Sequence, residues 1–275
     1  MKTFKSIMIK FIIFVICIIE IYPLFWMLTA SFKQQYEWAD KPAYALNAGF
    51  YFKNYIDAWT RGHMSVYFAN SFINTMIALV FIVYFTVTAG FALTKMEWKW
   101  RKRINSFFGL GIMVPVATAL IPLFQIYNKM NLMDTRTSLI LAYIAFGLSL
   151  SFYLVSGFLR TLPAEIMEAS VIDGCGIYKM MWHIVVPLMK NAIVTVLVLQ
   201  FFFKWNDLIF SMTFISSSNL KTIQTGLLYF QDEFGAKNWG AIFASVSMSV
   251  MPLLVLYIAL NKKVIEGMTA GAVKG

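Results

Sequence analysis

The connection between two long apolar runs reads RTLPAEIMEASVIDGCG over residues 160–176. Thr161 is a suitable N-cap, and Pro163 is tolerated in the first turn of a helix. Gly174 and Gly176 are residues that commonly end a helix. Between them, apolar residues recur at helical spacing, at Leu162, Ile166 and Ala169. This pattern predicts a short helix of about ten residues with one apolar face.

The acidic residues of this predicted helix, Glu165 and Glu168, fall on a different face from its apolar residues. A helix of about ten residues is roughly 15 Å long, which is half of the ~30 Å hydrocarbon core of a bilayer. The helix is therefore too short to cross a membrane. We expect it to lie across the cytoplasmic face, where it can press on a partner protein.

The rest of the chain has the composition of an integral membrane protein. Of its 275 residues, 60% are hydrophobic and only 13% are charged, whereas soluble domains carry about 25% charged residues. A soluble core of this size could not hide so much apolar surface. Six stretches reach the length of roughly 20 apolar residues that a membrane-spanning helix needs: about Phe11–Ala30, Phe68–Thr94, Ile104–Tyr127, Leu139–Leu159, Ile184–Phe203 and Ala241–Leu260.

Lysine and arginine residues near the ends of these stretches predict the orientation of the chain. One side carries 14 of them and the other 9, although the loops on the second side are longer. The loop after the second stretch alone holds five within residues 95–103. Because cytoplasmic loops are enriched in basic residues, we expect both termini to be cytoplasmic in a multi-pass protein of the plasma (inner) membrane.

Several function classes lack support in the sequence. The net charge is +10, but the basic residues lie in the gaps between apolar runs rather than on one polar face, which argues against nucleic-acid binding. Cys17, Cys175, His63 and His183 are isolated, so no metal site is expected. None of the 15 glycines is followed by lysine, so the Walker phosphate-binding loop is absent.

The short helix and the residues after it resemble a known motif. The pattern is Glu168-Ala169-Ser170, then Asp173-Gly174, then nine residues and Ile184-Val185-Val186-Pro187. It is similar to the EAA loop of the permease subunits of binding-protein-dependent ABC importers. Ser170 stands where the family usually has a second Ala, and Val186 where it usually has Leu. Both differences are small in size.

Other segments resemble the carbohydrate-importer branch, in particular the maltose-type inner-membrane subunit with six helices. The resemblance covers nearly the whole chain, most firmly from about Phe68 onward. The segments that carry it are Tyr22-Pro23-Leu24, Ser31-Phe32-Lys33, Trp205-Asn206-Asp207, residues 220–227, Asn238-Trp239-Gly240, Pro252 and the tail 267–275.

The resemblance implies an all-α permease in which the short helix is the coupling helix that docks on an ATPase. The residues implied in this coupling are Glu168, Ala169, Ser170, Asp173, Gly174 and Pro187. We expect Glu168 and Gly174 to matter for docking and shape, and Asp173 for capping the turn. The alternative is an ordinary solvated loop.

The implied partners are a second homologous permease, two cytoplasmic ATPase subunits and an extracellular solute-binding protein. ATP and Mg²⁺ would be bound by the ATPase subunits, and no cofactor is expected on this chain. The implied domains are an N-terminal helix with an external segment (1–67), the permease domain (68–262, coupling loop at about 160–187) and a cytoplasmic tail (263–275).

Sugars are bound by aromatic faces together with polar groups for the hydroxyls. Trp205, Asn206 and Asp207 supply both, and Gln200 could face the solute path. Tryptophan at a helix end is more often an interfacial residue. Glu20 lies midway along the first stretch, where an ionisable group is costly. A functional role and a structural bond to a neighbouring helix are about equally expected for it.

Two further classes are alternatives to an ABC permease for a di- or oligosaccharide. A self-sufficient secondary transporter would need ion-binding carboxylates near mid-membrane, and Glu20 is the only one. A membrane-embedded enzyme would need clustered His, Cys, Asp or Glu, which the sequence lacks.

Overall fold

The computed structural model describes residues 2–42, 44–234 and 238–272. Within them every regular element is helical, which confirms the all-α prediction. The helices in chain order are α1 (Lys2–Ala30), α2 (Gln35–Asp40), α3 (Lys53–Thr60), α4 (Met64–Lys95), α5 (Arg101–Ile112), α6 (Val116–Lys129), α7 (Arg136–Thr161), α8 (Ala164–Ile172), α9 (Ile177–Met180), α10 (Val186–Leu188), α11 (Lys190–Trp205), α12 (Ile209–Phe214), α13 (Ile223–Phe234) and α14 (Trp239–Ala272). A π-helical turn (Met181–Val185) joins α9 to α10, and a 3₁₀ turn (Ser218–Leu220) lies between α12 and α13.

Four of the described helices are long and apolar enough to cross a membrane by themselves: α1, α4, α7 and α14. The number rises to six if each of two bent helix pairs counts as one span. The pair α5 and α6 is bent by 105°, and the segment from α9 to α10 is bent by 77° against α11. Apolar segments therefore lie at both predicted places, 104–127 and 184–203, but each is a bent helix pair rather than one continuous helix.

Proline explains where both predicted helices break. Pro115 is the N-cap of α6; it has no N–H to donate, and it disfavours the helical conformation of Val114 before it. At the second break, Pro187 follows the π-helical turn and removes one more backbone donor. Met189 then leaves helical geometry with φ −90° and ψ 9°, which separates α10 from α11.

The chain divides into two compact units. Unit 1 holds the described residues of 1–65 and 226–252, and unit 2 those of 66–225 and 253–272. The domain boundaries inferred from the sequence remain predictions. The segment 263–272, the start of the predicted tail, continues helix α14, and residues 273–275 lie outside the described residues.

Unit 1 orders much of the predicted external segment through buried polar contacts. The side-chain amide of Asn54 donates hydrogen bonds to the carbonyls of Ser31 (2.9 Å) and Lys33 (2.8 Å). Aromatic rings add to the packing, since Trp38 stacks on Phe243 with ring centres 5.3 Å apart. One asparagine thus satisfies two loop carbonyls, which matters because carbonyl groups buried without a donor are costly.

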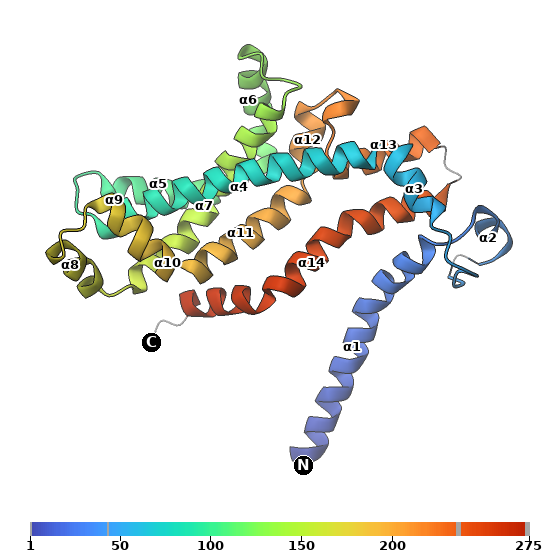
Figure 1. Cartoon of the computed structure of the whole chain (residues 1–275), viewed down its shortest axis with the longest axis horizontal. Helices are drawn as coiled ribbons and strands as arrows, with labels where there is room; N and C mark the ends of the chain where they lie inside the picture. The colour runs from blue at the N-terminus through green and yellow to red at the C-terminus, as the bar shows by residue number, and fades with distance from the viewer. Residues whose placement is uncertain (1, 43, 235–237, 273–275) are drawn as a thin grey trace. The chain divides into compact units, whose positions relative to one another are not determined.

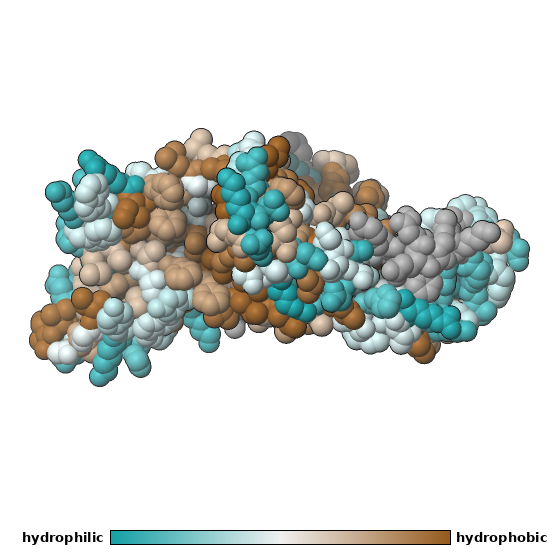
Figure 2. Space-filling view, turned by 90° about the horizontal axis from the view of Figure 1, so that it is seen from above, coloured by the Kyte–Doolittle hydropathy of each residue, from teal (hydrophilic) through white to brown (hydrophobic). Residues whose placement is uncertain are grey.

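The core of unit 2 forms where α7 packs against α5 and α11. Its buried residues include Ile82 from α4, Leu139 and Leu159 from α7, and Val196 from α11. Figure 1 shows α8 and α9 at one end of this unit, beyond the end of α7. In Figure 2, brown hydrophobic side chains cover much of the surface over this part, and its left-hand end carries teal hydrophilic side chains together with a brown patch. This distribution fits a membrane-embedded body with a water-exposed end.

A carboxylate connects two loops of unit 2. Asp134, between α6 and α7, has φ +56°. Its carboxylate accepts hydrogen bonds from the backbone amides of Ser216 and Ser217, both at 2.9 Å, and from the Ser217 hydroxyl. The Ser217 hydroxyl and amide, with the Ser216 amide, outweigh partial burial and hold the pKa of Asp134 below its ordinary value.

This carboxylate predicts how the stability of the protein depends on pH. A group whose pKa is lower in the folded state stabilises the fold above its ordinary pKa, and that contribution is lost as the pH falls through the folded value. Asp134→Asn should therefore lower the melting temperature at pH 7, and the difference from wild type should shrink below about pH 4. Thermal unfolding of the purified protein from pH 7 to pH 3 measures this. A difference that is unchanged at pH 3 would contradict it.

Candidate functional site

The connection after α7 contains the predicted short helix, here α8 (Ala164–Ile172). Its start differs in detail from the prediction. Thr161 is the last residue of α7, and its hydroxyl donates to the carbonyl of Phe158 (2.8 Å) rather than capping α8. Pro163 occupies the N-cap position instead of the first turn. The helix has nine residues, close to the predicted length.

The inward face of α8 also differs from the predicted one. Ser170 is buried, and its hydroxyl donates to the carbonyl of Ile166 at 2.6 Å. Ile166 and Met167 are half-buried beside it, whereas Ala169 is exposed. Glu168 is exposed as well. The sequence pattern therefore predicted the inward position of Ile166 correctly and that of Ala169 wrongly. The buried residue at the centre of this face is Ser170, a small polar residue that a hydropathy pattern does not identify as inward-facing.

The turn after α8 is closed by backbone hydrogen bonds. The amide of Asp173 donates to the carbonyl of Ala169 (2.9 Å), that of Gly174 to Val171 (3.0 Å), and that of Cys175 to Ser170 (2.9 Å). Gly174 has φ +75°, the left-handed conformation that glycine adopts without steric cost. The backbone of Asp173 thus takes part in the turn, and a role of its carboxylate in capping remains a prediction.

A hydrogen bond connects the end of helix α4 to the start of this connection. The ammonium of Lys95, the last residue of α4, donates to the carbonyl of Leu162 at 2.8 Å. Further along the same helix pair, a Cβ on Gly90 would lie 3.0 Å from Leu159 and 3.1 Å from Val155. Helices α4 and α7 therefore pack closely up to the link that carries α8, and a displacement of α8 acts on both.

The outer surface of the connection is apolar as well as acidic. Val171 (63%), Ile172 (84%) and Tyr178 (79%) are exposed. A cavity of about 410 Å³ opens beside them; it is lined by Phe91, Lys95, Met96, Met167, Glu168, Val171, Ile172, Ile177 and Met180. Pro187, the last residue of the predicted motif, is exposed in α10 beside the 77° bend. A surface of this kind on a connection outside the spans is suited to contact with another protein.

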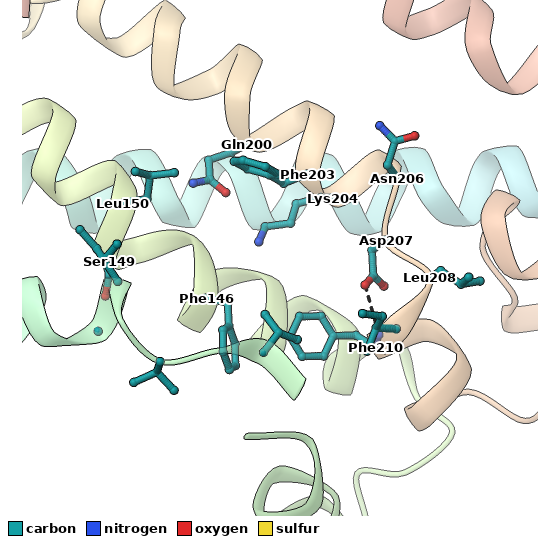
Figure 3. Close-up of a pocket in the computed structure, with 15 residues that line it drawn as sticks. Phe146, Ser149, Leu150, Gln200, Phe203, Lys204, Asn206, Asp207, Leu208 and Phe210 are labelled. Atoms are coloured by element: carbon teal, nitrogen blue, oxygen red, sulfur yellow. Dashed lines mark hydrogen bonds between the residues drawn. The ribbon is translucent and has the colours of Figure 1, made fainter. Parts of the chain in front are cut away.

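A second cavity, of about 620 Å³, lies in unit 2 beside α11 and α7 (Figure 3). It is lined by Gly111, Ile112, Val114, Val116, Phe146, Ser149, Leu150, Gln200, Phe203, Lys204, Asn206, Asp207, Leu208, Ile209 and Phe210. Its size falls within the ~300–1,000 Å³ of small-molecule sites, which are mostly apolar with a few polar groups. Of the residues that the sequence placed on a solute path, Gln200, Asn206 and Asp207 line it.

Asp207 has a structural role in this wall. Its carboxylate accepts hydrogen bonds from the Tyr143 hydroxyl (2.9 Å) and from the amides of Phe210 and Ser211 (both 3.1 Å). The two amides belong to the first turn of α12, so the carboxylate caps that helix. The Tyr143 bond connects α12 to α7. Asp207 therefore holds the wall in place through three hydrogen bonds.

Trp205 and Glu20 are not among the residues that line this cavity. Trp205 is 1% exposed; it stacks on Phe201 with ring centres 5.2 Å apart and meets Phe68 edge-on at the same distance. It packs within unit 2 and is not among the lining residues. Glu20 belongs to unit 1 and is exposed on α1. The apolar stretch of this helix is not buried against other described residues. A role in the solute path remains a prediction for both.

Sequence reasoning missed Lys204, which lines the cavity and is 8% exposed. It was counted with the loop cations that set the orientation. One signal could have identified it, because Lys204 lies four residues after Gln200 and therefore on the same face of α11. Among the described residues, no group of three or more His, Cys, Asp or Glu side chains could hold a metal ion.

Comparison with known proteins gives concordant matches. A family model described as the inner membrane component of binding-protein-dependent transport systems matches residues 83–269. The probable ABC transporter permease protein YurM of Bacillus subtilis is 30% identical over 92% of this chain and 84% of its own length. The melibiose/raffinose/stachyose import permease protein MelC of the same organism is 31% identical over 92% of this chain and 91% of its own.

A solved structure has the same fold. It is the crystal structure of a bacterial ABC transporter involved in the import of the acidic polysaccharide alginate. One of its chains superposes with a TM-score of 0.85, covering 94% of this chain and 96% of that one, at 18% sequence identity. Helices α1 to α14 therefore form a known permease fold.

Proposed function

Since the chain belongs to the family of inner membrane components of binding-protein-dependent transport systems, it is the permease subunit of an ABC importer, and we propose that its solute is a di- or oligosaccharide. Family membership sets aside the self-sufficient secondary transporter. The observation that carries the sugar assignment is the likeness to a melibiose, raffinose and stachyose permease over nine tenths of both chains. The cavity beside α11, with aromatic rings and amide groups in its wall, supports it.

The proposed mechanism is alternating access driven from outside this chain. Importers of this family work with ATPase and solute-binding partners. We propose two cytoplasmic ATPase subunits, a second homologous permease and an extracellular binding protein. α8 would dock on one ATPase through its exposed face. Its buried Ser170 and the Lys95–Leu162 bond would pass the displacement to α7 and α4, because packed elements deform little. The chain itself would catalyse no reaction.

Transport by the reconstituted importer tests this function. Proteoliposomes that hold both permeases and the ATPase subunits, supplied with the binding protein, should accumulate labelled melibiose or raffinose only with ATP. Accumulation should persist when ionophores collapse ion gradients. Sugar uptake driven by an ion gradient without ATP would overturn the proposal.

Orientation has its own test. Cys175 is half-buried in the turn after α8 and Cys17 lies in α1. In a Cys17→Ser background, a membrane-impermeant maleimide should label Cys175 only after cells are permeabilised. Labelling of intact cells would place α8 outside and end the coupling assignment.

Glu168 predicts a charge-dependent docking contact. It is exposed on α8 at the rim of the 410 Å³ cavity. Glu168→Lys should reduce uptake by about tenfold, which corresponds to about 1.4 kcal/mol of docking free energy. Glu165→Lys is the matched control, because it makes the same charge change at another exposed position of α8. Co-purification of the ATPase and uptake measure the effect, and equal losses in both variants would contradict a specific contact.

A further inference from the structure

Gln200 and Lys204 line the cavity beside α11 and carry polar atoms that the described residues leave without a hydrogen-bond partner. They are 2% and 8% exposed and lie one helical turn apart. The Gln200 amide nitrogen donates to the carbonyl of Gly147 (3.2 Å) and to the Ser151 hydroxyl (3.0 Å). These bonds fix the orientation of the amide. Its oxygen, Oε1, has no hydrogen-bond partner among the residues that the structure describes.

The Lys204 ammonium is available in the same space. In Figure 3 its side chain projects from α11 into the region bordered by Gln200 and Phe146. It lies 5.5 Å from the centre of the Tyr143 ring. Three ion pairs occur within the described part of the chain, and none of them includes Lys204. An ammonium has three donors, and a buried polar group without a partner is costly.

The positive charge of Lys204 has a negative charge nearby, but it forms no ion pair in the described part of the chain. Asp207 is close enough to interact electrostatically with it, although its carboxylate oxygens are taken up by Tyr143 and the first turn of α12. The cavity therefore has a near-zero net charge, but it keeps a free acceptor at Gln200 Oε1 and free donors at Lys204 Nζ. Because the Asp207 charge offsets that of Lys204, such a site supplies no net positive charge to hold an anion, and it suits a neutral polar ligand.

We propose that Gln200 and Lys204 form a subsite for a neutral, polyhydroxylated part of the transported solute. Gln200 Oε1 accepts a hydrogen bond from one hydroxyl, and Lys204 Nζ donates to the oxygen of another. The rings of Phe146, Phe203 and Phe210 in the same wall cover the C–H faces of the solute. This subsite rests on the proposed sugar transport and adds the residues and charge type by which the permease recognises its solute.

The test measures occupancy of the cavity directly in the complete importer. Ser149 lines the cavity and plays no part in the subsite. In a Cys17→Ser, Cys175→Ser background, Ser149→Cys is treated with a water-soluble methanethiosulfonate reagent, with and without ATP. Melibiose should slow the reaction in at least one of the two states. Digalacturonic acid, a charged disaccharide, should need an at least tenfold higher concentration for the same protection.

Variants of the lysine then identify its role. Lys204→Met should raise the melibiose concentration for half-protection at least tenfold, and Lys204→Arg should restore part of the protection. Lys129→Met is the matched control, since it removes an exposed lysine at the end of α6. If Lys204→Met fails to assemble, the charge-balanced pair Lys204→Met with Asp207→Asn takes its place.

Each outcome decides the proposal. No labelling of Ser149→Cys, unchanged protection in Lys204→Met, or better protection by the anion than by melibiose overturns the subsite. Uptake of melibiose is measured in the same preparations. If melibiose is taken up but does not protect the thiol of the Ser149→Cys variant, the proposed function stands and the subsite is refuted. If the importer with the otherwise wild-type cavity neither takes up nor is protected by any neutral sugar, both the proposed function and the subsite are refuted.

Discussion

Replacing Gly174 by valine is expected to reduce uptake more than tenfold while the permease still reaches the membrane. Gly174 has φ +75° in the turn that ends α8. A left-handed backbone costs a residue with a Cβ about 1–2 kcal/mol, and a β-branched residue adopts it least readily. The cost here is conformational, because a Cβ at this position would meet nothing within 4 Å. The turn would rearrange and α8 would leave its docking geometry.

The chain supplies a matched control two residues away. A Cβ added to Gly176 would also meet open space, but the φ of this residue is −66°, which any residue accepts. Gly176→Val should therefore keep most of the uptake, and Gly174→Asn should be intermediate because asparagine tolerates the left-handed region. Uptake and sugar-stimulated ATP hydrolysis, measured side by side, distinguish uncoupling from misfolding. Equal losses for the two valine variants would refute the role given to the turn.

The second large effect is expected at Gly240, near the start of α14. A Cβ there would lie 2.3 Å from the Asn54 amide nitrogen and 2.7 Å from the backbone carbonyl of Lys33. Asn54 is buried and already holds two loop carbonyls, so neither it nor the backbone can yield cheaply. Gly240→Ala should destabilise the protein by about 1–3 kcal/mol, and Gly240→Val by more. Thermal unfolding and the yield of assembled importer measure this.

Gly109→Ala serves as the control for that substitution. Gly109 lies in α5, where an added Cβ would have nothing within 4 Å, and alanine is the better helix former. We expect it to be neutral or slightly stabilising. Asn54→Ala should reproduce the loss expected for Gly240→Ala, because it leaves the carbonyls of Ser31 and Lys33 without their donor. A stable Gly240→Ala protein would show that the loop packing does not depend on this approach.

The sequence predicted the membrane spans and the short helix because both follow from local patterns. Apolar length marks a span, and Gly174 marks the end of α8 by its conformational freedom. The bends at Pro115 and Met189 were not predicted, because hydropathy counts apolar residues and does not record a change of direction. Proline was visible in both places, but whether it kinks or ends a helix depends on what packs around it.

The candidate solute site was predicted only in part. Gln200, Asn206 and Asp207 do lie in one cavity wall, but Trp205 between them is buried in the core. Trp205 is the last residue of α11, whereas Asn206 and Asp207 lie in the link after it, so neighbours in sequence need not face the same cavity. Lys204 was missed because its surroundings come from α7 and α12. Tyr143, the ring beside its ammonium, is 61 positions away in the sequence, and no local pattern connects the two.

The apolar side chains on the outside of α8 and α9 have a consequence for biogenesis. Val171, Ile172 and Tyr178 are exposed in the described part of the chain, and exposed hydrophobic surface outside a bilayer promotes self-association. A copy synthesised in excess of its partners would therefore aggregate or be degraded. Cells should gain from making the subunits in fixed proportion, and a shortage of ATPase should be followed by loss of this subunit.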